Sequence, residues 1–211
     1  MSHTCLPTVA GQFYDASPER LAEMIEAFQE EIEKNSPPKQ YDTQALILPH
    51  AGYIYSGNTA IRGLMSVKQK DYKRIVVLAP SHRVSFSGIA LSNYENHLTP
   101  LGPVEVDRKF VEKIEAKNNP FISVDDKIHA EEHALEVELP LLRTFFRDVP
   151  IIPIVCGESN DAMLSSLAND LQEFCTSDTL WIISSDFTHY GMSFNYVPFT
   201  DEVQQNIAKF F

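Results

Sequence analysis

The sequence contains few cysteines, and their spacing indicates no pairing. Cys5, Cys156 and Cys175 are the only cysteines in 211 residues, and no CxxC pair occurs. An odd and widely spaced set of this kind provides no disulfide framework, which small secreted domains usually need. We therefore expect a protein of the reducing cytoplasm.

Basic residues and long apolar runs are also scarce. Lys and Arg number 17 against 29 Asp and Glu, which gives a formal net charge of −12 at pH 7. Nucleic acids and anionic membranes bind basic surfaces, so this excess of acid argues against both as partners. No run is long enough for a membrane helix, and the N-terminus lacks the basic and apolar regions of a signal peptide. With 44% hydrophobic residues, the chain is expected to form one soluble globular domain over residues 1–211.

Two common catalytic signatures are missing from the sequence. The G-x-S-x-G elbow is absent, which disfavours a serine hydrolase although Ser81-His82 and Ser185-Asp186 supply the residue types. Neither G-x-G-x-x-G nor a Walker pattern occurs, so the glycines do not indicate a phosphate-binding loop.

Apolar runs alternate with amphipathic segments along the chain. Four runs, beginning at Ala45, Arg74, Val149 and Leu180, are apolar throughout instead of alternating with polar residues. Such runs are typical of strands buried on both faces of a largely parallel sheet. Helical spacing is found between and around them, at residues 18–35, 58–65, 108–114, 139–146, 163–174 and 201–211. The pattern predicts a three-layer α/β/α fold with a central, largely parallel or mixed sheet.

Residues suited to metal binding follow three of these apolar runs. His50 follows the first run, His82 the second, and Asp186 and His189 the fourth. Ligands of parallel sheets bind outside the carboxyl ends of the strands, so we expect the three histidines at one edge. Imidazoles with a carboxylate and open coordination positions suit non-haem iron, and such groups also accept copper or zinc. Asp186 can ligate the metal or orient a histidine, and a histidine beside the metal is a natural acid/base group.

A competing metal motif lies in the middle of the chain. His129-Ala130-Glu131-Glu132-His133 matches the H-x-x-E-H pattern, in which two histidines hold zinc and the glutamate is the base. That motif belongs inside a helix, whereas residues 125–127 indicate that the helix only begins near His129. His133 can instead reach the strand-end site from a helix end.

Motifs spread from residue 10 to residue 191 resemble those of the Memo-like family. The matching segments are Ala10-Gly11-Gln12-Phe13-Tyr14, Pro49-His50-Ala51-Gly52-Tyr53 with Tyr55-Ser56-Gly57, Ala79-Pro80-Ser81-His82, Glu132-His133-Ala134-Leu135-Glu136-Val137-Glu138-Leu139-Pro140, Ile152-Pro153-Ile154-Val155-Cys156-Gly157, and Ser184-Ser185-Asp186-Phe187-Thr188-His189-Tyr190-Gly191. The resemblance covers nearly the whole chain and is specific.

That family is similar in fold to the class III extradiol dioxygenases, non-haem iron enzymes that open catechol rings. The resemblance implies iron or copper held by His50 and His82, with His189 as the acid/base histidine and Asp186 beside it. It implies oxidative or redox chemistry, although one branch of the family consists of signalling effectors that bind phosphorylated peptides. In prokaryotes the family is associated with a radical-SAM protein, which is the partner protein that the resemblance suggests.

The family's third metal ligand is a cysteine in a Cys-Gly motif. It lies in a C-terminal segment beyond the position of Phe211, and we expect this chain to lack that segment. Cys156 is a different cysteine, so we do not assign the ligand role to it.

Three functional hypotheses follow. In the first, the chain is a metalloprotein that acts on a small molecule or peptide by oxidative chemistry, with Tyr53, Tyr55 and His133 lining the pocket. In the second, the same cleft binds a peptide or protein without turnover. In the third, the chain is a zinc hydrolase that uses His129, Glu132 and His133. A fold of this kind determines where a site lies and leaves its reaction open.

Overall fold

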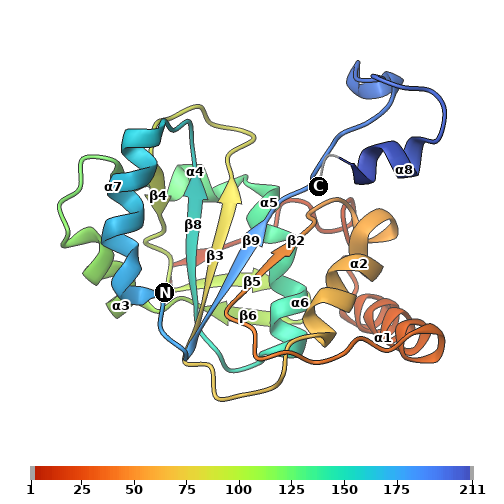
Figure 1. Ribbon diagram of the computed structural model, residues 1–211. Coiled ribbons are helices and arrows are strands. Elements are labelled where there is room, and N and C mark those ends of the chain that lie inside the picture. Colours follow the sequence, from red (N-terminus) through yellow and green to blue (C-terminus); the bar gives the residue numbers. More distant parts are fainter. Residues whose placement is uncertain (1–2, 210–211) are drawn as a thin grey trace.

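The central sheet follows the apolar runs of the sequence. The computed structural model describes residues 3–209, and the sheet lies in the middle of the molecule (Figure 1). Within these residues six strands pair in the order β2 (Ala45–Leu48), β9 (Thr179–Ser184), β3 (Arg74–Pro80), β8 (Ile151–Cys156), β4 (Ile89–Leu91) and β7 (Ile122–Val124). The first four are parallel neighbours, whereas β4 runs antiparallel to β8 and parallel to β7. The predicted mixed, largely parallel sheet is confirmed.

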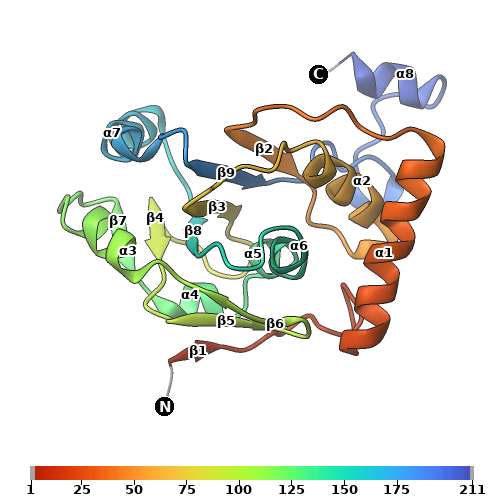
Figure 2. The same cartoon turned by 90° about the horizontal axis from the view of Figure 1, so that it is seen from below.

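Helices cover both faces of this sheet (Figure 2). On one face lies α7 (Asp161–Leu171), which continues into a 3-10 turn at Gln172–Phe174, and on the other lie α5 (His133–Glu136) and α6 (Glu138–Phe145). The remaining helices of the main body are α1 (Pro18–Asn35) and α2 (Tyr53–Met65), side by side next to β2, and α3 (Arg108–Glu115) and α4 (Asp126–Ala130), near β7 and β4. This arrangement is the three-layer α/β/α fold that the sequence predicts.

A second, smaller sheet was not expected from the sequence. It has the order β1 (Thr4–Cys5), β5 (Asn96–Thr99) and β6 (Gly102–Glu105), and it lies outside α6 (Figure 2). Strands of two to four residues are too short to show a hydrophobic period, which is why the sequence pattern did not reveal β1 and β5.

The first helix forms where its cap and its apolar spacing predict. The Ser17 side chain accepts a backbone N–H of the first turn, and Pro18 occupies the first helical position. Leu21, Ile25 and Ile32 lie on one face and are buried. Burial of this face fixes α1 against the rest of the core.

The second helix begins earlier than the sequence predicts. The expected start was residue 58, but α2 begins at Tyr53, whose N–H bonds to the carbonyl of Phe13 at 2.7 Å. Glycine has a low intrinsic helix propensity, yet Gly57 lies inside α2. A Cβ at this position would stand only 3.1 Å from Phe28 of α1, so the close packing of the two helices favours a residue without a side chain. Close packing of the two helices therefore outweighs the intrinsic preference of glycine.

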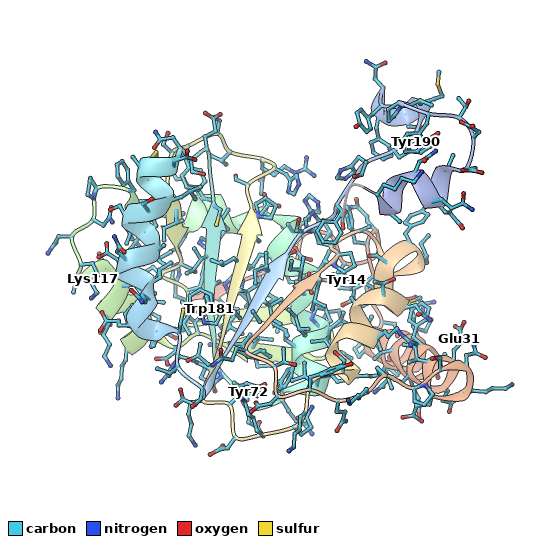
Figure 3. All side chains as sticks on the ribbon, in the orientation of Figure 1. Tyr14, Glu31, Tyr72, Lys117, Trp181 and Tyr190 are labelled. Carbon is cyan, nitrogen blue, oxygen red and sulfur yellow. The ribbon has the colours of Figure 1, made fainter. Side chains whose placement is uncertain are left out.

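The chain after β9 leaves the main body. It forms a 3-10 turn at Met192–Phe194 and then α8 (Val203–Ala208), at the upper right of Figure 1. Figure 3 shows Tyr190 on this segment, well away from Trp181 on β9. The predicted helix 201–211 corresponds to α8, and its last two residues lie outside the described part of the chain. Among residues 3–209, no helix combines the length and apolarity that crossing a membrane requires.

Candidate metal centre

Three histidines from separate parts of the chain meet at the carboxyl edge of the sheet. His50 follows β2, His82 follows β3, and His133 is the first residue of α5. Each offers a ring nitrogen, and these three atoms all lie within 4.8 Å of one another. Ring centroids are 5.2 Å apart for His50 and His82, 5.7 Å for His50 and His133, and 4.6 Å for His82 and His133. We call these residues the histidine triad.

The backbone explains why the first two members lie together. β2 and β3 are both hydrogen-bonded to β9, which separates them in the sheet, and all three strands run in the same direction. Their carboxyl ends are therefore side by side, and the residues that follow them face the same space above the sheet. Proline precedes His50 directly and His82 by two residues, as each strand ends.

A serine hydroxyl sets the protonation of His50. The Nδ1 atom of His50 lies 2.9 Å from Ser184 Oγ, and that hydroxyl donates its only proton to the carbonyl of Ala134 at 2.7 Å. Nδ1 must therefore carry the proton and donate it to the serine. This leaves the lone pair of Nε2 free for a metal ion. Burial lowers the pKa of His50, although the charge of Asp186 opposes the shift, so the imidazole is neutral at pH 7.

A buried glutamate orients the imidazole of His82. Glu132 is 1% exposed, and its carboxylate accepts hydrogen bonds from the backbone N–H of His82 (2.6 Å), from His82 Nδ1 (2.9 Å) and from the N–H of Ala134 (3.0 Å). Burial alone would raise the pKa of Glu132, but these hydrogen bonds outweigh it and lower the pKa below its usual value. The ionised carboxylate fixes Nδ1–H on His82 and leaves Nε2 as the free nitrogen.

His133 completes the triad with a nitrogen that lacks a partner. Its Nδ1 is buried, lies 3.3 Å from Glu132 Oε1, and has no hydrogen-bond partner among residues 3–209. Its ring packs against Phe13 with centroids 5.0 Å apart. Burial lowers the pKa of His133, so it too is neutral at pH 7. One ring nitrogen of His133 lies within 4.8 Å of a nitrogen of each of the two oriented imidazoles, which fits a third metal ligand.

The donor set fits a transition metal. Three imidazoles with a nearby carboxylate suit iron, copper or zinc, and three protein ligands leave coordination positions open. Cys156 lies at the end of β8 and is not part of the triad. Burial raises the pKa of its thiol to about 11, so Cys156 is not a ready thiolate ligand.

Asp186 and His189 stand beside the triad. Asp186 Oδ1 accepts the backbone N–H of His50 at 2.8 Å, and its Oδ2 lies 3.9 Å from Nε2 of both His50 and His189. The His189 side chain is 55% exposed and packs against Phe194 of the C-terminal segment. The aspartate therefore connects a triad histidine with the histidine that we predicted as the acid/base group.

Other residues singled out in the sequence lie elsewhere. Tyr53 is 1% exposed and its hydroxyl donates to the carbonyl of Val137, which places it in the core, while Tyr55 is 82% exposed. Their substrate-binding role stays a prediction, and the burial of Tyr53 limits it to a supporting position. The groove next to the triad, about 460 Å³, is instead lined by His82, Arg83 and residues of β3, β8 and the loop 84–86.

The structure does not form the H-x-x-E-H arrangement. The helix is interrupted at Glu131, between α4 and α5, so His129 and His133 are not on one helix. His129 is buried and is not part of the triad, and its Nε2 bonds to the carbonyl of Ala90 at 3.0 Å. The zinc hydrolase hypothesis loses its geometric basis, because it requires both histidines to face one ion.

Two supporting residues were missed in the sequence. Ser184 was quoted only as part of a motif, and Glu132 was considered only as a zinc-site base. Their actual partners, His50 and His82, are 134 and 50 residues away. The one available signal was that Ser184 directly follows the apolar run 180–183.

Comparisons with known proteins agree with the motifs. The family model for the Memo-like protein matches residues 6–210. A MEMO1 family protein of Pyrococcus horikoshii is 35% identical over 201 residues, which is 92% of this chain and 68% of that protein. One from Thermococcus onnurineus is 33% identical (96% and 72%), and the memo-1 homolog of Caenorhabditis elegans is 30% identical (93% and 56%). On this evidence the chain belongs to the Memo family.

Proposed function

We propose that this chain binds one iron or copper ion through His50, His82 and His133 and uses it for oxidative chemistry on a small molecule. The observation that carries the proposal is the preset hydrogen bonding of the triad. His50 and His82 each have Nδ1 occupied as a donor, so both present Nε2 to the same space. A site built for hydrogen bonding alone would not need three imidazole nitrogens within 4.8 Å of one another.

The surrounding residues divide the remaining tasks. Bound iron or copper would supply oxidative chemistry at the triad. The groove beside His82, which Arg83 also lines, would hold the substrate. His189 would take or give a proton at Nε2, with Asp186 stabilising its charged form from 3.9 Å.

Metal content of the purified protein tests the proposal. The wild type, His50→Ala/His82→Ala and His133→Ala would be isolated without chelator, loaded anaerobically with Fe(II) or Cu(I), and analysed by mass spectrometry. His3→Ala is the control, because His3 is an exposed histidine whose partner is Asp126. We expect one metal ion in the wild type and the control, and none in the triad variants.

Other outcomes separate the alternatives. A wild type that takes up no metal would overturn the proposal and favour a cleft that only binds a peptide or protein. Stoichiometric zinc with no uptake of iron or copper would contradict the oxidative part and leave the site itself intact. Loss of metal in His3→Ala would show that uptake is not specific to the triad.

A further inference from the structure

Glu138 is a buried glutamate without a hydrogen-bond partner. It is the first residue of α6, its exposed fraction is 0%, and neither carboxyl oxygen has a partner among residues 3–209. Buried carboxylates are normally hydrogen-bonded, because an unpaired charge in a protein interior is strongly disfavoured. The position of Glu138 therefore needs an explanation.

The two other buried glutamates of this region are fully satisfied. Glu132 accepts three hydrogen bonds, as described above. Glu136 accepts four, from Thr8 N, Thr8 Oγ1, Val9 N and the hydroxyl of Tyr14, at distances between 2.6 and 3.0 Å. The region thus supplies donors for a carboxylate where one is held ionised, and it supplies none at Glu138.

The polar groups next to Glu138 already use their protons elsewhere. The hydroxyl of Tyr53 donates to the carbonyl of Val137 at 2.8 Å, and the hydroxyl of Ser184 donates to the carbonyl of Ala134 at 2.7 Å. The charged group facing this position is Asp186, which repels a second negative charge. Burial, only partly offset by the nearby Ser184 hydroxyl and reinforced by Asp186, raises the pKa of Glu138 to about 8.

Ser184 connects this glutamate to the histidine triad. It receives the Nδ1–H of His50 and gives its own proton to Ala134 of α5, the helix that begins with His133. One serine therefore connects His50 with the helix that carries His133, and it can do so only while its hydroxyl donates to the carbonyl of Ala134. The second lone pair of its oxygen remains available to accept a hydrogen bond from a protonated Glu138.

We propose that Glu138 is a neutral carboxylic acid that donates a hydrogen bond to Ser184, and that this keeps the serine hydroxyl directed at the carbonyl of Ala134 and holds His50 and α5 in register. Glu138 is a positioning residue, since it acts on the triad through Ser184. An ionised Glu138 would attract the serine proton to itself, because a hydrogen bond to a carboxylate is stronger than one to a carbonyl. The hydrogen bond from Ser184 to Ala134 of α5 would then be lost. The inference rests on the proposed function only for its effect on a bound metal ion.

Infrared spectroscopy of the metal-free protein tests the protonation directly. At pH 6 the wild type should show the carbonyl band of a protonated carboxylic acid in a difference spectrum against Glu138→Gln. That band should disappear in the wild type as the pH is raised through about 8. Absence of the band at pH 6 would overturn the proposal, and the pH titration of the wild type gives this answer even if a variant fails to fold.

Nuclear magnetic resonance tests the positioning. In the metal-free wild type, the imidazole signals of His50 and the amide of Ala134 should shift together with the same midpoint near pH 8. Glu138→Gln keeps a neutral donor beside Ser184, so its spectrum should match the wild type at pH 6.5 and show no shift at pH 9. Glu136→Gln is the matched control, a buried glutamate with its own partners, and it should keep the shift. Equal shifts in the wild type and Glu138→Gln would contradict the proposal.

A bound probe ion extends the test to the metal. The visible absorption of Co(II) at the triad should change between pH 7 and pH 9 in the wild type and stay constant in Glu138→Gln. An unchanged Co(II) spectrum in the wild type would overturn the effect on the metal. Failure to bind Co(II) at all would count against the proposed function, whereas the infrared and NMR results on metal-free protein would still decide the role of Glu138.

Discussion

Glu132 binds both the backbone N–H and the imidazole Nδ1–H of His82, at 2.6 and 2.9 Å. The two contacts fix the position of the residue and the orientation of its ring. Because Glu132 is also the N-cap of α5, accepting the N–H of Ala134, the same carboxylate places His133. One buried side chain thus determines the geometry of two of the three triad histidines.

Replacing this carboxylate should weaken metal binding without removing any triad member. Glu132→Gln loses the negative charge and no longer enforces Nδ1–H on His82. Loss of such a supporting partner typically costs about 10- to 100-fold in metal affinity. Titration calorimetry with Zn(II) would measure the change. Glu131→Gln, an exposed neighbour, is the control and should bind like the wild type. Unchanged affinity in Glu132→Gln would contradict the assigned role.

His133 and His129 should behave differently when each is replaced. His133→Asn should lose the metal ion, because the triad then has two imidazoles. His129→Asn should keep full metal stoichiometry, since His129 faces Ala90 and is not part of the triad. Mass spectrometry of metal-loaded protein gives the answer. Loss of metal in His129→Asn with a native circular dichroism spectrum would restore the zinc-peptidase alternative.

His189 should affect turnover and leave metal binding nearly unchanged. It contacts the site through Asp186 and is more than half exposed. We expect His189→Gln to bind metal within about twofold of the wild type and to lower the rate of an oxidative reaction by roughly 100-fold or more, the usual range for loss of a general acid/base. Asp186→Asn should reduce both the metal affinity and the reaction rate, because Asp186 also accepts the backbone N–H of His50. A large loss of metal in His189→Gln would make it a ligand instead.

Two buried histidines should make the fold sensitive to mild acid. Burial lowers the pKa of His97 to about 3 and that of His129 to about 4, from an ordinary value of 6.5. In the window from pH 6.5 down to about 4 the unfolded chain binds protons that the folded chain does not, so the free energy of unfolding falls as the pH is lowered. The expected slope is at most about 1.4 kcal/mol per pH unit for each histidine.

Urea unfolding at pH 7.0, 5.5 and 4.5 would measure this slope. His97→Gln should reduce it, whereas His3→Gln, at an exposed position, should leave it as in the wild type. A denaturation midpoint that stays constant from pH 7 to pH 5 would contradict the prediction.

Much of the fold could be predicted because the strands carry their own signal. Ile75, Val76 and Val77 are buried on consecutive positions, as expected of a strand covered on both faces. The start of α2 at Tyr53 could not be predicted, because it depends on contacts with Phe13 and Phe28, distant in sequence.

The candidate site was predictable in part for the same reason. His50 and His82 follow strands, and strand ends of a parallel sheet meet. His133 comes from a helix that begins after a break at Glu131, and its approach to the triad depends on how Glu132 and Ser184 hold that helix. These are pairings between separate segments, and no local pattern encodes them.

The three triad histidines come from positions 50, 82 and 133, and the serine that orients one of them from position 184. Most of the described chain must therefore be assembled before the ligands meet, so a metal ion cannot nucleate an early local structure during folding. Under the proposed function the ion would bind to the finished architecture, and by mass action it would add about RT ln(1 + [metal]/Kd) to the free energy of unfolding. The melting temperature of the whole molecule should thus rise with metal concentration, and a chelator should return it to a fixed metal-free value.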